Sequence, residues 1–362
     1  MTRTTDGSPE APPPAGGGGP QGFAAEVRDA VSLRAALLLF GVLALQIAFI
    51  TSYIGAFHKP EPHEIPLAVV TPSAPLTEET VTRLAALPGD PLDPRATADE
   101  AVARERIENR EIDGALVVAP RGTTDRLLIA SASGASLSQA LTEVVAAAER
   151  AQGRSLDVVD VVPGSPGDAR GLSSFYLVVG WCVGGYLCAA ILAISAGARP
   201  ANGHRALIRL GALLLYSIAA GLLGAVIAGP VLDALPGGVP ALWGLGALVV
   251  FTVGALTLAC QGLAGIVGIG LAILLVVVLG NPSAGGAYPY PLLPPFWRAI
   301  GPALPPGAGT FAARSISYFR GNGAGGPMLV LAAWAVAGSL ITVVCALRRT
   351  TGTAGTTGTT GR

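Results

Sequence analysis

Lysine is almost missing from this sequence, since Lys59 is the only lysine among the 23 basic residues and the others are arginine. A Walker A loop needs a lysine after a glycine-rich run, where its ammonium group reaches the β- and γ-phosphates of a nucleotide. Lys59 stands in HKPEPH, with no glycine pattern before it. We therefore expect that this chain does not hydrolyse ATP by itself.

Cysteine is also scarce, and the chain has no C-x-x-C pair and no cluster of cysteine with histidine. Zinc, iron–sulfur and disulfide interpretations are therefore weakly supported. The cysteines all lie within apolar runs or at their edges, which is typical of packing residues; they are Cys182, Cys188, Cys260 and Cys345. We expect no metal and no cofactor.

Two of the three histidines, His58 and His63, flank KPEP just after the first apolar run. Their spacing admits a metal site or a pH sensor. The two prolines make that spacing unreliable, and we favour a solvated linker next to the membrane.

Charge is the third scarcity: 13% of residues are charged and 51% are hydrophobic, whereas soluble domains carry roughly 25% charged residues. This composition indicates a membrane protein, with the lipid bilayer as its first partner. The 23 basic and 23 acidic residues cancel, so the net charge predicts no nucleic-acid partner.

Long apolar runs predict an α-helical polytopic membrane protein with six transmembrane helices, because a spanning helix needs about 20 apolar residues. The six runs cover residues 35–57, 173–196, 207–228, 239–260, 262–279 and 328–346. As domains, these give helix 1 at 35–57, helices 2–5 within 173–280, and helix 6 at 328–347. The fourth and fifth runs meet at residues 260–262, which predicts a tight hairpin.

Arginine in short loops predicts the orientation, because cytoplasmic loops retain positive charge. Arginines precede the first run, surround the loop between the second and third, and follow the last. This pattern places both termini in the cytoplasm of a multi-pass protein of the bacterial plasma membrane. It sends residues 58–172 and the loop at 281–327 outside the cell.

Three segments near the termini are set apart by composition. Residues 1–22 and 348–362 are rich in Pro, Gly and Thr, which predicts disordered cytoplasmic tails. Residues 23–34 read as a short amphipathic segment, which either extends the first span or lies at the interface against a partner.

Residues 58–172 carry most of the charge and have the periodicity of a folded soluble domain. Strands alternating with helices predict an extracytoplasmic α/β domain inserted between helices 1 and 2. The expected strands are 65–70, 114–120, 126–131 and 156–162, and the expected helices are 77–87, 96–112 and 136–152. The Glu78–Glu79 pair after Thr77 suits a helix N-terminus there.

No constellation in this chain predicts an enzyme. The carboxylates around residues 96–112 alternate with arginine, which favours exposed ion pairs rather than an acid–base pair. The apolar runs have no Asp, Glu, His or Lys in their central turns, which argues against proton antiport but leaves sodium coupling through hydroxyls and carbonyls open.

Small residues four apart, as at Gly180 and Gly184 or at Gly221, Ala225 and Gly229, permit close approach of helices. They favour either a compact bundle or a homodimer seam.

The stretch NPSAGGAYPYPLLPPFW, at 281–297, comes directly after the fifth run. Its prolines break helices, and its aromatics are of the kind that settle at lipid headgroup depth. It predicts an interfacial or re-entrant loop, which either lines a path between helices or only anchors the chain at the membrane surface.

Together these features resemble the bacterial phage-infection-protein/YhgE group, which belongs with the ABC type-2 permease-like membrane proteins. The resemblance covers roughly residues 35–347 and includes IPLAVV and ATADEAVARERIENREIDGALVVAP. Its motif residues are Asn281, Pro282, Ser283, Gly285, Gly286, Pro294, Pro295, Phe296 and Pro305.

The resemblance implies a permease-type subunit that exports a hydrophobic or cell-envelope substrate when a separate ATPase drives it. The short loop between helices 2 and 3 offers Arg199, Arg205 and Arg209 as the contact with that ATPase; otherwise residues 23–34 supply it, or no ATPase binds. The alternative is a non-transporting scaffold or receptor, which binds a secretion apparatus, envelope component or phage through its outer domain.

Overall fold

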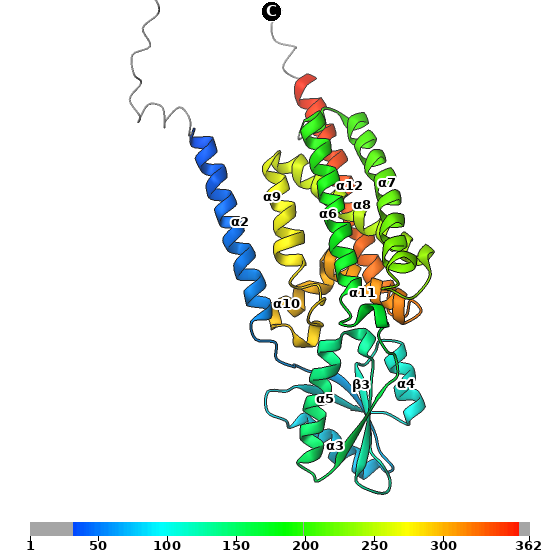
Figure 1. The fold of residues 1–362 in the computed structure, drawn as a ribbon. Coiled ribbons are helices and arrows are strands. Elements are labelled where there is room, and N and C mark those ends of the chain that lie inside the picture. The colour runs from blue at the N-terminus through cyan, green and yellow to red at the C-terminus, as the bar shows by residue number, and fades with distance from the viewer. Residues whose placement is uncertain (1–31, 198, 355–362) are drawn as a thin grey trace, which may run out of the picture. The chain divides into compact units, whose positions relative to one another are not determined.

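The structure is a computed structural model that describes residues 32–197 and 199–354 (Figure 1). The chain divides into two units, residues 1–47 and 48–362. The described part of the first unit belongs to helix α2 (Leu33–Phe57), whose apolar side chains are mostly exposed. The second unit contains all the other helices and strands. The predicted amphipathic segment lies almost wholly outside the described residues, and so does the tail at 1–22.

Five helices in the described residues are long and apolar enough to cross a membrane. They are α2, α6 (Ser173–Ala196), α7 (Gly203–Val226, continued by the π-helix η3, Ile227–Val231), α8 (Val239–Ala264) and α12 (Gly325–Ala354). The first two spans agree with the predicted limits, Ala35–Phe57 and Ser173–Ala196. The α12 helix continues to Ala354, so the prediction of a disordered tail from residue 348 is wrong over its first seven residues.

The predicted fifth span at 262–279 is wrong. Helix α8 runs to Ala264, and the chain then reverses at Gly265, whose φ of 65° is readily adopted only by glycine. The chain continues as a shorter apolar helix, Val267–Gly280, made of α9 (Val267–Ile273) and the π-helix η4 (Leu274–Gly280). Its 14 residues rise roughly 21 Å, whereas a bilayer core is about 30 Å thick. The predicted tight hairpin is present, but its second arm is only a partial span.

Helix α8 is the central element of the bundle, because it is apolar on all sides and packs against α6, α7 and α12. Glycines let these helices approach its backbone. A Cβ at Gly221 of α7 would lie 2.4 Å from Ala247 N, and one at Gly185 of α6 would lie 2.6 Å from Val250 O. Small residues therefore serve packing within one chain. A homodimer stays a prediction.

The α/β domain contains a five-stranded sheet in the order β2-β1-β3-β4-β5. All neighbouring pairs are parallel except β3 with β4. The strands are β1 (Ile65–Val70), β2 (Leu92–Ala96), β3 (Gly114–Val117), β4 (Thr124–Ile129) and β5 (Ser155–Asp160). The helices are α3 (Ala74–Ala85), α4 (Glu100–Glu108) and α5 (Ala135–Arg150), with short 3₁₀ turns at Ser131–Ser133 and Pro166–Asp168. Apolar residues of α3 and α5 cover one face of the sheet, and those of α4 cover the other.

Several details of the domain differ from the sequence prediction. The strands expected at 114–120, 126–131 and 156–162 lie at Gly114–Val117, Thr124–Ile129 and Ser155–Asp160. The edge strand β2 was missed, because LDPRA is short, polar and contains a proline, which edge strands tolerate. Helix α3 begins at Ala74 rather than Thr77, with Pro75 in its first turn. The predicted helix at 96–112 is confined to α4, where Asp99 caps the N-terminus by accepting a 2.8 Å hydrogen bond from Val102 N.

The segment at 281–327 is a folded element rather than a loop lying on the surface. It contains η5 (Tyr290–Leu292), α10 (Pro295–Ile300), η6 (Gly301–Ala303) and α11 (Pro305–Tyr318). Leu292 and Tyr288 pack into the core on one face of the sheet, and Phe319 and Tyr318 pack on the other face. The α/β domain and this segment therefore share both hydrophobic cores.

The close approach of α7 to α8 gives a testable prediction. Gly221→Ala should lower the free energy of unfolding by about 1–3 kcal/mol, because the new methyl group would overlap the backbone of α8. Gly211→Ala on the same helix is the matched control, since nothing lies within 4 Å of a Cβ there. Thermal unfolding in detergent measures both. Equal melting temperatures for the two variants would contradict this packing.

Candidate functional site

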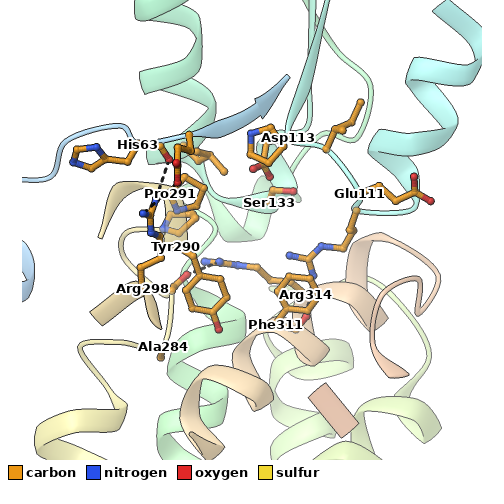
Figure 2. Close-up of a pocket in the computed structure, with 17 residues that line it drawn as sticks. His63, Glu111, Asp113, Ser133, Ala284, Tyr290, Pro291, Arg298, Phe311 and Arg314 are labelled. Atoms are coloured by element: carbon orange, nitrogen blue, oxygen red, sulfur yellow. Dashed lines mark hydrogen bonds and ion pairs between the residues drawn. The ribbon is translucent and has the colours of Figure 1, made fainter. Parts of the chain in front are cut away.

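A cavity of about 410 Å³ lies where the α/β domain meets the segment before the last span. Both parts contribute its walls, and the lining is rich in charged groups. In the close-up of Figure 2, Asp113 and Ser133 lie on the side of the sheet, and Tyr290, Phe311 and Arg314 lie opposite them. Its volume is within the range of ordinary small-molecule sites, about 300–1,000 Å³.

Arg314 on α11 organises the floor of this cavity. The side chain is 3% exposed, and its guanidinium donates three hydrogen bonds to backbone carbonyls. Nη1 donates to Gly285 O at 2.7 Å, and Nη2 donates to Gly286 O at 2.7 Å and to Gly171 O at 2.9 Å. The planar guanidinium can serve several acceptors at once. It thereby joins the segment after η4 to the turn before α6.

Two glycines make this arrangement possible. Gly285 has a φ of 68°, a conformation that favours glycine. A Cβ at Gly286 would lie 2.3 Å from Cγ of Phe175. Larger residues at either position would displace the carbonyls from Arg314.

Arg110 reaches the same region from the α/β domain, just after α4. Its Nη1 donates to Phe311 O at 2.9 Å and to the Ser315 hydroxyl at 2.7 Å. Its guanidinium carbon lies 3.5 Å from the centroid of the Phe311 ring and 4.9 Å from that of Phe319. Cation–π attraction therefore adds to the hydrogen bonds. Arg110 is the principal polar link between the domain and α11.

The two arginines raise each other's electrostatic energy. Burial, followed by the positive charge of Arg314, lowers the pKa of Arg110 to about 9. Burial also lowers the pKa of Arg314. The pKa of Asp113 shifts in the opposite direction. Burial raises it to about 6, even though the positive charge of Arg110 opposes that shift. The cavity thus brings the guanidiniums of Arg110 and Arg314 together with a carboxyl whose pKa is raised to about 6.

Other charges near the cavity are paired within the chain. Arg298 on α10 lies 3.3 Å from the Glu64 carboxylate and donates to His63 O at 3.3 Å. Glu111 pairs with Arg106 at 3.3 Å. These contacts fasten the linker before β1 and the end of α4.

The first motif residues are buried, and of them Gly285 lines the cavity. Asn281, Pro282 and Ser283 are buried, and the Ser283 hydroxyl donates to Leu279 O at 2.7 Å. Gly285 and Gly286 supply the carbonyls that Arg314 binds. These motif residues therefore shape the backbone, and two of them hold the arginine.

The remaining motif residues begin helices. Pro294 caps α10 and Pro295 is its first residue, while Pro305 begins α11 and is buried. Phe296 is 57% exposed. Of the aromatic residues at 281–297, Phe296 is exposed, while Tyr288, Tyr290 and Trp297 are partly buried. Tyr288 packs against the α/β domain and Tyr290 lines the cavity, so these two do not lie at the surface as the headgroup interpretation requires.

The three arginines predicted to contact an ATPase have different environments. Arg199 Nη2 donates to Leu263 O at 2.8 Å, and Arg209 Nη2 donates to Ala196 O and Gly197 O at 2.7 and 2.8 Å. These two side chains satisfy carbonyls at the ends of α8 and α6. Arg205 is exposed and remains available to a partner.

The cavity residues Arg110, Asp113 and Arg314 were not singled out as a site by sequence reasoning. Arg110 and Arg314 are about 200 positions apart, and no local pattern reports that they meet. One usable signal was Arg314 itself, a lone charge within the small-residue run TFAARSISYF. The two linker histidines are not brought into a metal site: within residues 32–197 and 199–354 no group of three or more potential ligands gathers.

No protein-family model matches this chain, and no curated protein matches it.

Asp113 predicts a pH dependence of stability. Its pKa rises from 3.8 to about 6 on folding, so between these values the folded state holds a proton that the unfolded state releases. Stability should therefore fall as the pH rises through this window and stay reduced above it. Asp113→Asn should raise the melting temperature at neutral pH and remove this part of the pH profile. Thermal unfolding from about pH 4 to pH 8 measures it.

The matched control is Asp157→Asn, which changes an exposed carboxylate on β5. If the melting temperature of Asp113→Asn depends on pH in the same way as those of the control and the parent protein, the raised pKa of Asp113 is contradicted.

Proposed function

We propose that this protein is the membrane subunit of a permease-type exporter, which moves a hydrophobic or cell-envelope substrate with energy from a separate ATPase. The observation that carries the proposal is the partial span, Val267–Gly280, which ends in buried, non-helical backbone at Asn281–Gly286. Non-helical backbone at membrane depth is tolerated only where protein surrounds it or where it lines a cavity. Interrupted helices of this kind are typical of transporter sites.

Contacts around the partial span support this proposal. A Cβ at Gly309 of α11 would lie 2.8 Å from Cγ1 of Val178 on α6. A Cβ at Gly280 would lie 2.6 Å from Pro306. The partial span and α11 therefore pack closely together beside a full span. Movement of this pair against α6 and α8 is the step that we assign to transport.

In this proposal the α/β domain lies outside the cell and the turn between α6 and α7 lies in the cytoplasm, as the arginine distribution predicts. Arg205 is the arginine at that turn that is exposed and not engaged with helix ends. We assign to it the contact with the ATPase.

A receptor or scaffold is the second candidate, and a specific observation favours it. Arg199 and Arg209 are engaged within the chain, and the connection between α8 and α9 is two residues long, Gly265 and Ile266. Within residues 32–197 and 199–354, these features leave a small surface for an ATPase on the side predicted to be cytoplasmic.

Purification of the tagged full-length protein from native membranes, followed by measurement of ATP hydrolysis, separates the two candidates. The exporter proposal predicts that ATPase activity accompanies the parent protein and falls at least about tenfold for Arg205→Glu, because charge reversal at a contact costs several kcal/mol. Arg121→Glu is the matched control, since Arg121 is exposed on the α/β domain. The control should retain the activity.

Two results would contradict the exporter. One is the absence of ATPase activity from the parent preparation, and the other is loss of activity with Arg121→Glu instead of Arg205→Glu. The latter result would also reverse the assigned orientation.

A further inference from the structure

The cavity at the domain junction has an unbalanced charge. Arg110 and Arg314 line it, and in the described part of the chain neither forms an ion pair within 4.0 Å. Arg298 and Glu111 have partners of opposite sign, as described above. The groups that remain are therefore two guanidiniums and the carboxyl of Asp113. Their sum is one positive charge when Asp113 is ionised and two when it is neutral.

The arginine of the α/β domain retains donors that the fold does not use. Its hydrogen bonds to Phe311 and Ser315 both leave from Nη1. Within the described residues, Nε and Nη2 make no hydrogen bond. Guanidinium nitrogens in this state bind oxyanions in a planar, two-point geometry.

A hydroxyl group lies across the cavity from Arg314. Ser133, in the turn before α5, faces the cavity from the side of the sheet in Figure 2, and among the described residues its hydroxyl has no hydrogen-bond partner. The half-buried Ser133 can donate to an anion that rests on Arg110. The cavity volume of about 410 Å³ accommodates a phosphate group together with a short attached chain.

We propose that this cavity binds a phosphoryl oxyanion. The guanidinium of Arg110 holds the anion, the Ser133 hydroxyl donates a hydrogen bond to it, and the fixed positive charge of Arg314 attracts it. A phosphoryl group offers three acceptor oxygens and up to about two negative charges, which match the two guanidiniums. The group belongs either to free phosphate or to a lipid headgroup. The inference holds for an exporter and for a receptor alike.

Asp113 limits the affinity in this arrangement, because its ionised carboxylate repels the anion. The groups that line the same cavity are Arg110, Arg314, Arg298, His63, Glu64, Glu111 and Tyr290. One of these groups is an imidazole, that of His63. Comparison with Asp113→Asn isolates the aspartate, because both proteins keep His63.

Isothermal titration calorimetry of the full-length protein in detergent tests the site, with inorganic sulfate as an oxyanion that does not titrate and inorganic phosphate as the second probe. Asp113→Asn should bind both probes about tenfold more tightly at about pH 8, because a nearby negative charge is removed. With sulfate as the probe, the parent protein should approach that affinity as the pH falls below about 6. Arg110→Gln should lose at least tenfold, and Arg121→Gln should bind as the parent does.

Asp113→Asn keeps the test decisive if Arg110→Gln fails to fold. Weaker binding by Asp113→Asn would overturn the proposal, because the carboxylate would then contact the ligand, as it would for a zwitterion. Dissociation constants above about 1 mM for both probes, with the parent protein and with Asp113→Asn, would also overturn it.

A comparison of the affinities for a soluble lipid phosphate and for inorganic phosphate identifies the source of the phosphoryl group. Dihexanoyl phosphatidic acid carries the same phosphate on a soluble lipid. Binding about tenfold tighter than that of inorganic phosphate supports a lipid headgroup, since the attached chain adds apolar contact. Equal or weaker binding supports free phosphate as the ligand.

Discussion

The contact on which this structure most depends is the one between the Arg314 guanidinium and three backbone carbonyls. The backbone after the partial span is not helical, so its carbonyls need donors from elsewhere in the protein. Arg314 supplies two donors to Gly285 and Gly286 and another bond to Gly171. One side chain therefore closes the end of the partial span and fixes the turn that leads into α6.

The position of the α/β domain depends on the same constraint. Once α11 is held by Arg314, its residues Phe311 and Ser315 contact Arg110. Phe319, which follows α11, packs into the core on the face of the sheet that α4 covers. On the other face of the sheet, Leu292 enters the core formed with α3 and α5. A movement of the partial span would thus reach the domain through packed side chains. The two arginines that hold this junction, Arg110 and Arg314, also line the cavity.

Sequence patterns predicted the helices and strands whose limits are determined by residues close together in the chain. The apolar runs at 35–57 and 173–196 and the strand Ile65–Val70 were predicted with their observed limits. Hydropathy failed at 262–279 because it does not report that α8 continues to Ala264, which leaves too few residues for another span. The cavity was missed because Arg110 and Arg314 meet only through tertiary packing. Orientation and partners stay predictions.

Hydrogen–deuterium exchange on Arg314→Lys tests the central role of the guanidinium most directly. Lysine keeps the charge and loses the planar group of donors, so peptides that cover 166–172 and 281–293 should exchange faster than in the parent protein. Peptides from β1 and β3 should keep their protection. Unchanged exchange in the first two regions would contradict the account, because their backbone would then be held by something other than Arg314.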